Sequence, residues 1–286
     1  MIDAHFHSWQ LSRGDYGWLT PKMGSIYRDV SVADWQKLAQ PLGITGGILV
    51  QAAPTVAETL HLLKLADENQ AVLGVVGWVD FTATDAVAQI ENIAKHPKLK
   101  GLRPMLHDLP DPAWILQSAV QPALAAMERL GSVFDALIRP VHLPHILEIA
   151  QLYPKLSIVI DHCAKPEISR GIHAAWQPWA TGLGALAVQP NVSCKLSGLL
   201  TEAGKSTESS KANLCNPWIE YVLNIFGADR IIWGSDWPVL ELAGTYQNWF
   251  EYCQEIPNSL LTPSLLNLQK ENIFGNNATR IYNLIT

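Results

Sequence analysis

The feature that most constrains the fold is a regular alternation of short apolar runs and longer amphipathic stretches. The short runs have the β-branched, apolar character of strands and lie at residues 2–7, 45–51, 72–80, 99–106, 133–139, 156–162, 191–196 and 230–236. Helical spacing of apolar residues occurs at 32–42, 55–69, 83–96, 112–130, 143–153, 171–188 and 213–226. Strands joined by helical crossovers are parallel, and eight such units in 286 residues predict a (β/α)8 barrel.

The predicted architecture is therefore an α/β fold: one TIM-barrel domain over residues 1–286, distorted, with a C-terminal helical extension within 243–286. A doubly wound open sheet is the alternative, but no glycine-rich phosphate loop follows an early strand. No low-complexity linker divides the chain, which favours one domain over two.

The first loop, residues 8–29, is long and carries Trp9, Tyr16, Trp18 and Tyr27. Long loops in compact domains are usually functional. We expect this loop to be a lid over the barrel mouth; the alternative is that its aromatic residues only pack the loop against the barrel rim.

Composition excludes several kinds of partner. A net charge of −6 argues against nucleic acid and anionic membranes, and no apolar run is long enough to span a bilayer. The four cysteines are widely spaced, without a CxxC pair, and we expect no cleavable leader before the first strand. We expect a cytoplasmic protein with a small-molecule substrate; the sequence leaves open whether it is a monomer or a homodimer.

The first strand contains a His-x-His pair, His5 and His7, preceded by Asp3. Side chains alternate along a strand, so these three polar residues are expected on one face. Burying them without partners is costly, which makes the pair a candidate ligand set for a divalent metal or an acid–base pair. The alternative is a hydrogen-bonded cluster that fastens the N-terminus.

Each of the other seven predicted strands also carries a polar or ionisable residue near its carboxyl end, where TIM barrels place their active sites. These residues are Gln51, Asp80, Arg103, Asp135, Arg139, His162, Lys195 and Asp236. Asp161 has the opposite parity to His162 and is expected to point away from the barrel axis.

Each of these residues also has a purely structural interpretation. Arg103 could form a buried ion pair with Asp80 or Asp135, and Lys195 could hold a helix end. Trp78 and Trp237 could be packing residues rather than sugar-stacking platforms.

Motifs along nearly the whole chain resemble the amidohydrolase superfamily, in particular its branch of sugar-lactone and 2-pyrone-4,6-dicarboxylate lactonases. The motifs are IDAHFHSW (2–9), GILVQAA (47–53), GVVGWVD (74–80), KGLRP (100–104), FDALI (134–138), VIDHCAKP (159–166), NVSCKLSGL (191–199) and RIIWGSDWPV (230–239). The resemblance implies a barrel hydrolase that opens lactones derived from aldoses such as fucose or rhamnose.

The resemblance implies that Asp236 handles the attacking water, flanked by His162 and the pair His5 and His7; the remaining roles are expected from charge and residue type. Asp236 is the expected general base toward water, with His162 beside it on the carbonyl or the leaving ring oxygen, and Arg103 and Lys195 stabilise the developing oxyanion. Trp9, Tyr27, Gln51, Trp78 and Trp237 are the predicted substrate-binding residues.

A metal is the least determined feature. The strand at 133–139 lacks the His or Lys that metal-dependent superfamily members generally place there, which argues against a binuclear centre. One divalent ion, zinc first, on His5, His7 and Asp236 is the expectation, and a metal-free reaction stays open.

Three alternatives remain at this point. A pyrone dicarboxylate would require several arginines, and the strand ends supply only Arg103 and Arg139. A decarboxylase of the same superfamily and a non-catalytic sugar-binding barrel are the others. The balance favours a neutral sugar lactone as substrate.

Overall fold

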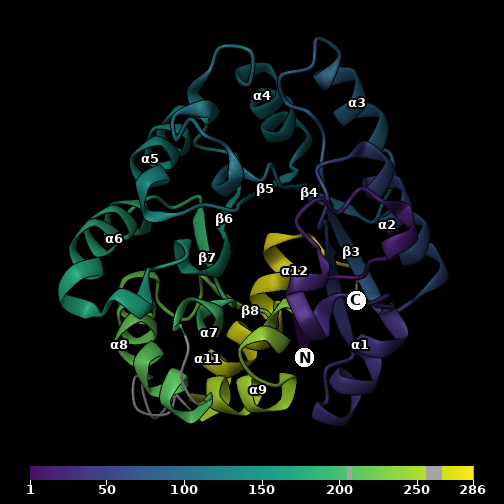
Figure 1. The fold of residues 1–286 in the computed structure, drawn as a ribbon. Coiled ribbons are helices and arrows are strands. Elements are labelled where there is room, and N and C mark those ends of the chain that lie inside the picture. The colour runs from purple at the N-terminus through teal and green to yellow at the C-terminus, as the bar shows by residue number, and fades with distance from the viewer. Residues whose placement is uncertain (205–207, 256–265, 286) are drawn as a thin grey trace.

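The computed structural model describes residues 1–204, 208–255 and 266–285, which form the predicted (β/α)8 barrel (Figure 1). The strands are β1 Ile2–Phe6, β2 Gly46–Val50, β3 Val72–Gly77, β4 Leu99–Leu102, β5 Val133–Ala136, β6 Ile158–Ile160, β7 Val192–Leu196 and β8 Ile231–Trp233. Each strand pairs in parallel with the next in chain order. Just beyond β8, the Asp236 N–H donates to the His5 carbonyl at 2.8 Å and closes the ring.

Helices surround the strands in Figure 1. They are α1 Val32–Ala39, α2 Val56–Glu68, α3 Ala86–Ile93, α4 Gln121–Leu130, α5 Leu143–Leu152, α6 Ile172–Ala187, α7 Leu199–Glu202, α8 Glu208–Phe226, α9 Tyr246–Glu255, α11 Leu266–Glu271 and α12 Asn277–Ile281. The predicted helix over 112–130 is wrong in its first half: Trp114–Leu116 is a 3-10 turn, and α4 begins only where Pro122 can occupy a first helical turn. No helix in the described part of the chain is long and apolar enough to cross a membrane.

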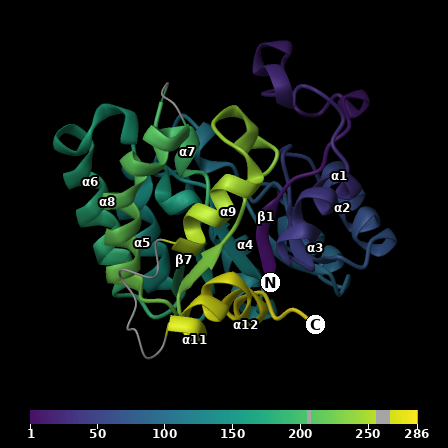
Figure 2. The same cartoon turned by 90° about the horizontal axis from the view of Figure 1, so that it is seen from below.

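The two ends of the barrel differ. In Figure 2, β1 runs away from the end covered by α11 and α12 toward the end where residues 8–29 project. The predicted C-terminal extension is helical in α9, α11 and α12, while 256–265 and Thr286 lie outside the described residues. The C-terminal segment therefore covers the amino-terminal ends of the strands.

A small apolar cluster fills the barrel at the amino-terminal ends of the strands, the lower end of the barrel. Part of this cluster comes from the C-terminal segment. Its fully buried members include Ala4, Val50, Val76, Val159 and Ile232 from the strands, with Ala278 and Tyr282 from the C-terminal segment. Inward-facing apolar side chains make such a barrel a packed core rather than a pore. Any site must therefore lie at the opposite end, where the strands terminate.

Several strands end earlier than predicted. Residues 78–80 and 234–236 leave the ladder as loops at the barrel mouth, and residues 161–162 begin a short 3-10 segment there. Their polar side chains are freed from the strict alternation of a strand. This difference determines the geometry of the site.

Candidate active site

The polar residues of β1 do not share one face, contrary to prediction. Asp3 pairs with Gly47 and Phe6 with Leu49, so one extra residue is inserted in β1 between them. Such a bulge reverses the side-chain parity beyond it. Asp3 consequently points outward and accepts hydrogen bonds from Trp35, Ser235 and Tyr246, whereas His5 and His7 reach the barrel mouth.

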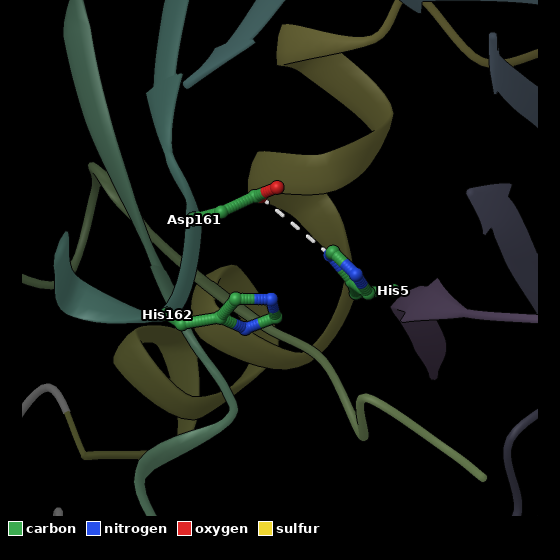
Figure 3. A group of neighbouring side chains, drawn as sticks. All are labelled: His5, Asp161 and His162. Atoms are coloured by element: carbon green, nitrogen blue, oxygen red, sulfur yellow. Dashed lines mark ion pairs between the residues drawn. The ribbon is translucent and has the colours of Figure 1, made fainter. Parts of the chain in front are cut away.

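The predicted orientation of Asp161, at the end of β6, is also wrong. Asp161 does not point away from the axis: it is fully buried and lies 3.5 Å from His5 Nδ1 (Figure 3). The strand stops at Ile160, and His162 has a left-handed backbone with φ of 53°. Strand parity does not apply to this turn, so consecutive side chains both enter the barrel.

Asp236 lies at the centre of the upper site, after β8, with φ of 58°. Its Oδ1 is 3.4 Å from His7 Nε2, 3.7 Å from His5 Nε2 and 3.8 Å from His162 Nε2. The other nitrogen of His7, Nδ1, donates to the Val50 carbonyl at 2.8 Å, so Nε2 of a neutral His7 carries a lone pair. Two acceptors face each other there, and a proton, a water molecule or a cation must lie between them.

The charge states follow from burial and neighbours. Burial opposes ionisation of Asp236, but His162 and His7 outweigh it and lower the pKa of this carboxyl. Burial lowers the pKa of His5 and of His162 well below the usual value. The site at neutral pH is thus a carboxylate beside two neutral imidazoles.

A second set of charges lies beneath this site. Lys195 is fully buried, and its Nζ is 2.9 Å from Asp161 Oδ1, 3.2 Å from His5 Nδ1 and 3.5 Å from Asp135 Oδ1. Burial by itself would raise the pKa of Asp161, yet Lys195 and His5 hold it well below its ordinary value. Burial raises the pKa of Asp135 to about 6.

Arg103 connects the two levels. Its Nη1 lies 3.3 Å from Asp161 and 3.4 Å from His5 Nε2, and its Nη2 donates to the backbone carbonyl and side chain of Gln51. Gln51 in turn donates to the Arg103 carbonyl at 2.9 Å. Gln51 therefore fixes the guanidinium and is itself buried away from the cavity.

A cavity of about 290 Å³ opens above these residues. Its floor is formed by His7, Arg103, His162 and Asp236. The walls are Trp18, Met23, Ala52, Met105, His107, Asp108, Leu137, Lys165, Val239 and Leu242. The lining combines apolar side chains with the polar side chains of His107, Asp108 and Lys165.

The predicted aromatic substrate-binding residues do not line this cavity. Trp9 and Trp237 are both buried. The Trp9 indole donates to the Arg28 carbonyl, and the Trp237 indole donates to the Glu241 carboxylate. Tyr27 is 38% exposed. Trp78 lines a neighbouring cavity of about 520 Å³ together with Asp80.

Trp18 was expected only as part of the 8–29 lid, and sequence reasoning missed the other wall residues, among them Met23, His107 and Lys165. Trp18 and Met23 belong to the 8–29 loop, whose lid prediction gave a signal for the loop but not for individual side chains. His107 and Lys165 follow the ends of β4 and β6, one turn further than the strand-end pattern reaches. A search limited to the ends of the predicted strands therefore does not identify His107 or Lys165.

Two buried groups have ligand atoms within 4.8 Å of one another: His5, His7 and Asp236, and His5, Asp161 and His162. A tetrahedral site with bonds of about 2.1 Å has ligands about 3.4 Å apart, close to the separations around Asp236 Oδ1. The first group fits a divalent ion; in the second, Asp161 is already paired with Lys195. Because both groups share His5, they suit one ion rather than two.

Comparison with known proteins agrees with this fold and shows the family. Residues 2–284 match the amidohydrolase family, and the chain belongs to it. An L-fucono-1,5-lactonase of Burkholderia ambifaria is 42% identical, covering 99% of this chain and 95% of that protein. An L-fucono-1,5-lactonase of Burkholderia multivorans is 30% identical, covering 99% and 96%. A solved amidohydrolase structure from Burkholderia multivorans with bound zinc has a TM-score of 0.92 at 30% identity, covering 99% of both chains.

Proposed function

We propose that this protein is a hydrolase that opens a small aldono-lactone, with L-fucono-1,5-lactone as the first candidate substrate. The observation that carries the proposal is the buried Asp236 carboxylate, which faces a small cavity between imidazoles and one arginine. Two of the relatives named above are L-fucono-1,5-lactonases. Acyl transfer to water requires a base, an oxyanion stabiliser and a proton donor, and residues suited to each role surround this cavity.

Asp236 is the proposed general base. Its lowered pKa keeps it ionised at neutral pH, so it can accept a proton from water that attacks the lactone carbonyl. The Arg103 guanidinium lines the cavity and is held by Gln51 and Asp161, and its proposed role is to stabilise the negative charge that develops on the lactone oxygen.

His162 is the proposed partner of the leaving ring oxygen. Its Nδ1 lies 2.8 Å from Ser197 Oγ, which orients Nε2 toward Asp236 and the cavity. Lys195 does not line the cavity, so we assign it to holding Asp161 and His5 rather than to the oxyanion itself.

The cavity walls favour a 6-deoxy sugar lactone. Met23, Leu137 and Leu242 offer apolar contact for a methyl group. Among the polar lining residues, His107 has a buried Nδ1 without a partner in the described residues, able to bond a ring hydroxyl. A site that pairs hydroxyls in this way discriminates strongly against analogues lacking them.

Zinc is the proposed ion if one binds, held by His5, His7 and Asp236. When bound, a divalent ion would polarise the carbonyl and lower the pKa of water. Arg103 already places positive charge 3.4 Å from His5 Nε2, so we propose that the ion assists turnover without being indispensable.

The alternatives find less support. Among the described residues the cavity is lined by one arginine, Arg103, and Arg139 is exposed elsewhere, which leaves a pyrone dicarboxylate poorly clamped. The inward residue of β5 is Asp135 rather than a metal-binding His, which disfavours a decarboxylase. A cytoplasmic location and a monomeric or homodimeric state stay predictions.

An assay that follows proton release or uptake with a pH-indicator dye, in weakly buffered solution, tests the proposal. Lactone hydrolysis releases protons, decarboxylation consumes them, and a sugar-binding protein does neither. The panel contains fucono-, rhamnono- and galactono-lactones and a pyrone dicarboxylate, each with and without chelator. We expect acidification that is fastest with the 6-deoxy lactones; no acidification with any lactone would refute the proposal.

A further inference from the structure

We propose that the neighbouring cavity of about 520 Å³, lined by Trp78 and Asp80, is a subsite for a second sugar ring. The substrates then include disaccharide lactones, in which another sugar is joined to the lactone ring. The inference deepens the proposed function and rests on it for its kinetic consequence. The proposed reaction takes place in the catalytic cavity alone, so the larger cavity beside it has no role in that reaction.

The two cavities share part of their lining. Trp18, Met105 and Asp108 line both of them. The indole N–H of Trp18 donates to the Ala52 carbonyl at 2.7 Å, which fixes the ring where the two cavities meet. A substituent on a lactone bound beside Asp236 therefore has the second cavity within reach.

Three tryptophans line the second cavity and come from different segments of the chain. Trp18 lies on the 8–29 loop, Trp78 directly follows β3, and Trp114 begins the 3-10 turn before α4. All three are half-buried, so part of each indole is left uncovered by the protein. An indole has a flat apolar face, on which the C–H face of a sugar ring can stack while its hydroxyl groups stay free to form hydrogen bonds. Three partly exposed indoles around one cavity therefore favour a flat, amphipathic ligand.

The polar side chains of the second cavity supply hydrogen-bond acceptors. They are the carboxylates of Asp15, Asp80 and Asp108 and the hydroxyl of Thr82. A carboxylate accepts hydrogen bonds, and each sugar hydroxyl can donate one. Among the described residues that line this cavity, none is Lys, Arg or His, so the repulsion between like charges disfavours an anionic ligand. The lining therefore suits a neutral polyhydroxylated ring.

Two of these carboxylates are held in place by donors within the protein. Asp15 Oδ2 lies 2.6 Å from Arg13 Nη2 and accepts a hydrogen bond from Thr55 Oγ1 at 3.0 Å. Asp80 Oδ1 accepts from Thr82 Oγ1 at 2.6 Å. Arg13 offsets the charge of Asp15, which weakens the attraction of the cavity for an organic cation. Oriented carboxylates whose charge is partly compensated favour sugar hydroxyls over an ammonium group.

The subsite should affect catalysis only for substrates that reach it. Binding energy gained away from the reacting carbonyl raises kcat/KM for such a substrate. We therefore expect a disaccharide lactone to have a kcat/KM about tenfold above that of its single-ring parent. Removing one indole should abolish most of this ratio, because stacking requires the second ring. Loss of a purely structural tryptophan would change both substrates by the same factor, so the ratio separates the two roles.

The test compares Trp78→Ala with Trp176→Ala. Trp176 is also half-buried, but it lies on α6 and packs against Trp179 and Trp218. The substrates are hexono-1,5-lactones with a glucosyl or galactosyl group on O2, O3 or O4, each beside its unsubstituted parent. The indicator-dye assay gives kcat/KM, and thermal melting gives stability. We expect the ratio of two-ring to one-ring kcat/KM to fall about tenfold in Trp78→Ala and to stay at the wild-type value in Trp176→Ala.

Calorimetric titration with the neutral disaccharides that correspond to these lactones measures binding without turnover. We expect saturable binding to the wild-type protein and about tenfold weaker binding to Trp78→Ala. If Trp78→Ala does not fold, Trp114→Ala takes its place in both measurements, since it removes another indole from the same cavity.

A wild-type ratio of one or below for every linkage would overturn the inference, as would an equal loss for one-ring and two-ring lactones in Trp78→Ala. Binding of choline that is lost in Trp78→Ala, without binding of any disaccharide, would assign the cavity to an organic cation instead. If the wild-type protein hydrolyses no lactone, the proposed function has failed, and the calorimetric comparison by itself decides whether the cavity binds a sugar.

Discussion

Two layers of ionisable residues lie at the same end of the barrel and do different work. The upper layer (His7, His162 and Asp236) lines the cavity and keeps polar atoms directed at its contents. The lower layer (Asp135, Asp161 and Lys195) is fully buried, and its charges are directed at one another. The same residue types at strand ends therefore indicate chemistry only where an atom is left available to a ligand.

The largest expected effect is in the upper layer. Asp236→Asn keeps the shape of the side chain but removes the base, so kcat should fall by about 100- to 1,000-fold while the melting temperature stays near that of wild type. Steady-state kinetics and circular dichroism check this. A folded variant with near-normal turnover would show that another group activates the water.

A substitution in the lower layer should mainly lower the free energy of unfolding. Asp161→Asn leaves Lys195 and Arg103 without their shared carboxylate in a buried setting, which should cost about 3 kcal/mol of unfolding free energy. Denaturant unfolding measures the loss. A cost below 1 kcal/mol would mean that Asp135 alone suffices as counter-ion, and the comparison of layers would need revision.

The ionisation of Asp161 also predicts that the free energy of unfolding depends on pH. The folded-state pKa of Asp161 lies below its unfolded-state value of about 4, so its stabilisation is complete above that value and is lost as pH falls through the folded-state pKa. Wild type should thus lose more stability than Asp161→Asn on acidification below about pH 4. Parallel unfolding curves of the two proteins from pH 6 to 3 would contradict this.

Removal of a bound metal should lower turnover only moderately. We expect at most one equivalent of zinc per chain, abolished in His7→Ala, and a loss of turnover below about tenfold on chelation, because Arg103 supplies charge at the same place. Elemental analysis and chelator titration measure both. Two equivalents, or complete and zinc-reversible inactivation, would show that the upper layer is primarily a metal centre.

The smallest effect concerns the 8–29 loop. Trp18 lines the cavity and donates to the Ala52 carbonyl at 2.7 Å, whereas Tyr27 lies outside the cavity. Trp18→Ala should lower kcat/KM about fivefold through poorer exclusion of water, and Tyr27→Phe should not change it. If both variants melt early with normal kinetics, the loop packs against the rim and is not a lid.

Much of the barrel could be predicted from its repeating pattern, since eight strand–helix units allow few architectures. Asp236, His162 and Arg103 were placed at the mouth by their positions at strand ends, as the structure has them. The faces of Asp3 and Asp161 were predicted wrongly because both depend on where the ladder loses its regular alternation. A bulge and a left-handed turn leave no periodic trace in one sequence.

Apolar periodicity and the order of motifs can be seen in the sequence, so the fold class and the family could be predicted from it. Which charged groups line the cavity and which are paired with each other could be seen only in the folded molecule. Lys195 and Gln51 lie behind the cavity, and Tyr282 enters the barrel from the far end of the chain. Whether a buried charge is available or saturated depends on contacts between residues distant in sequence, which local pattern does not contain.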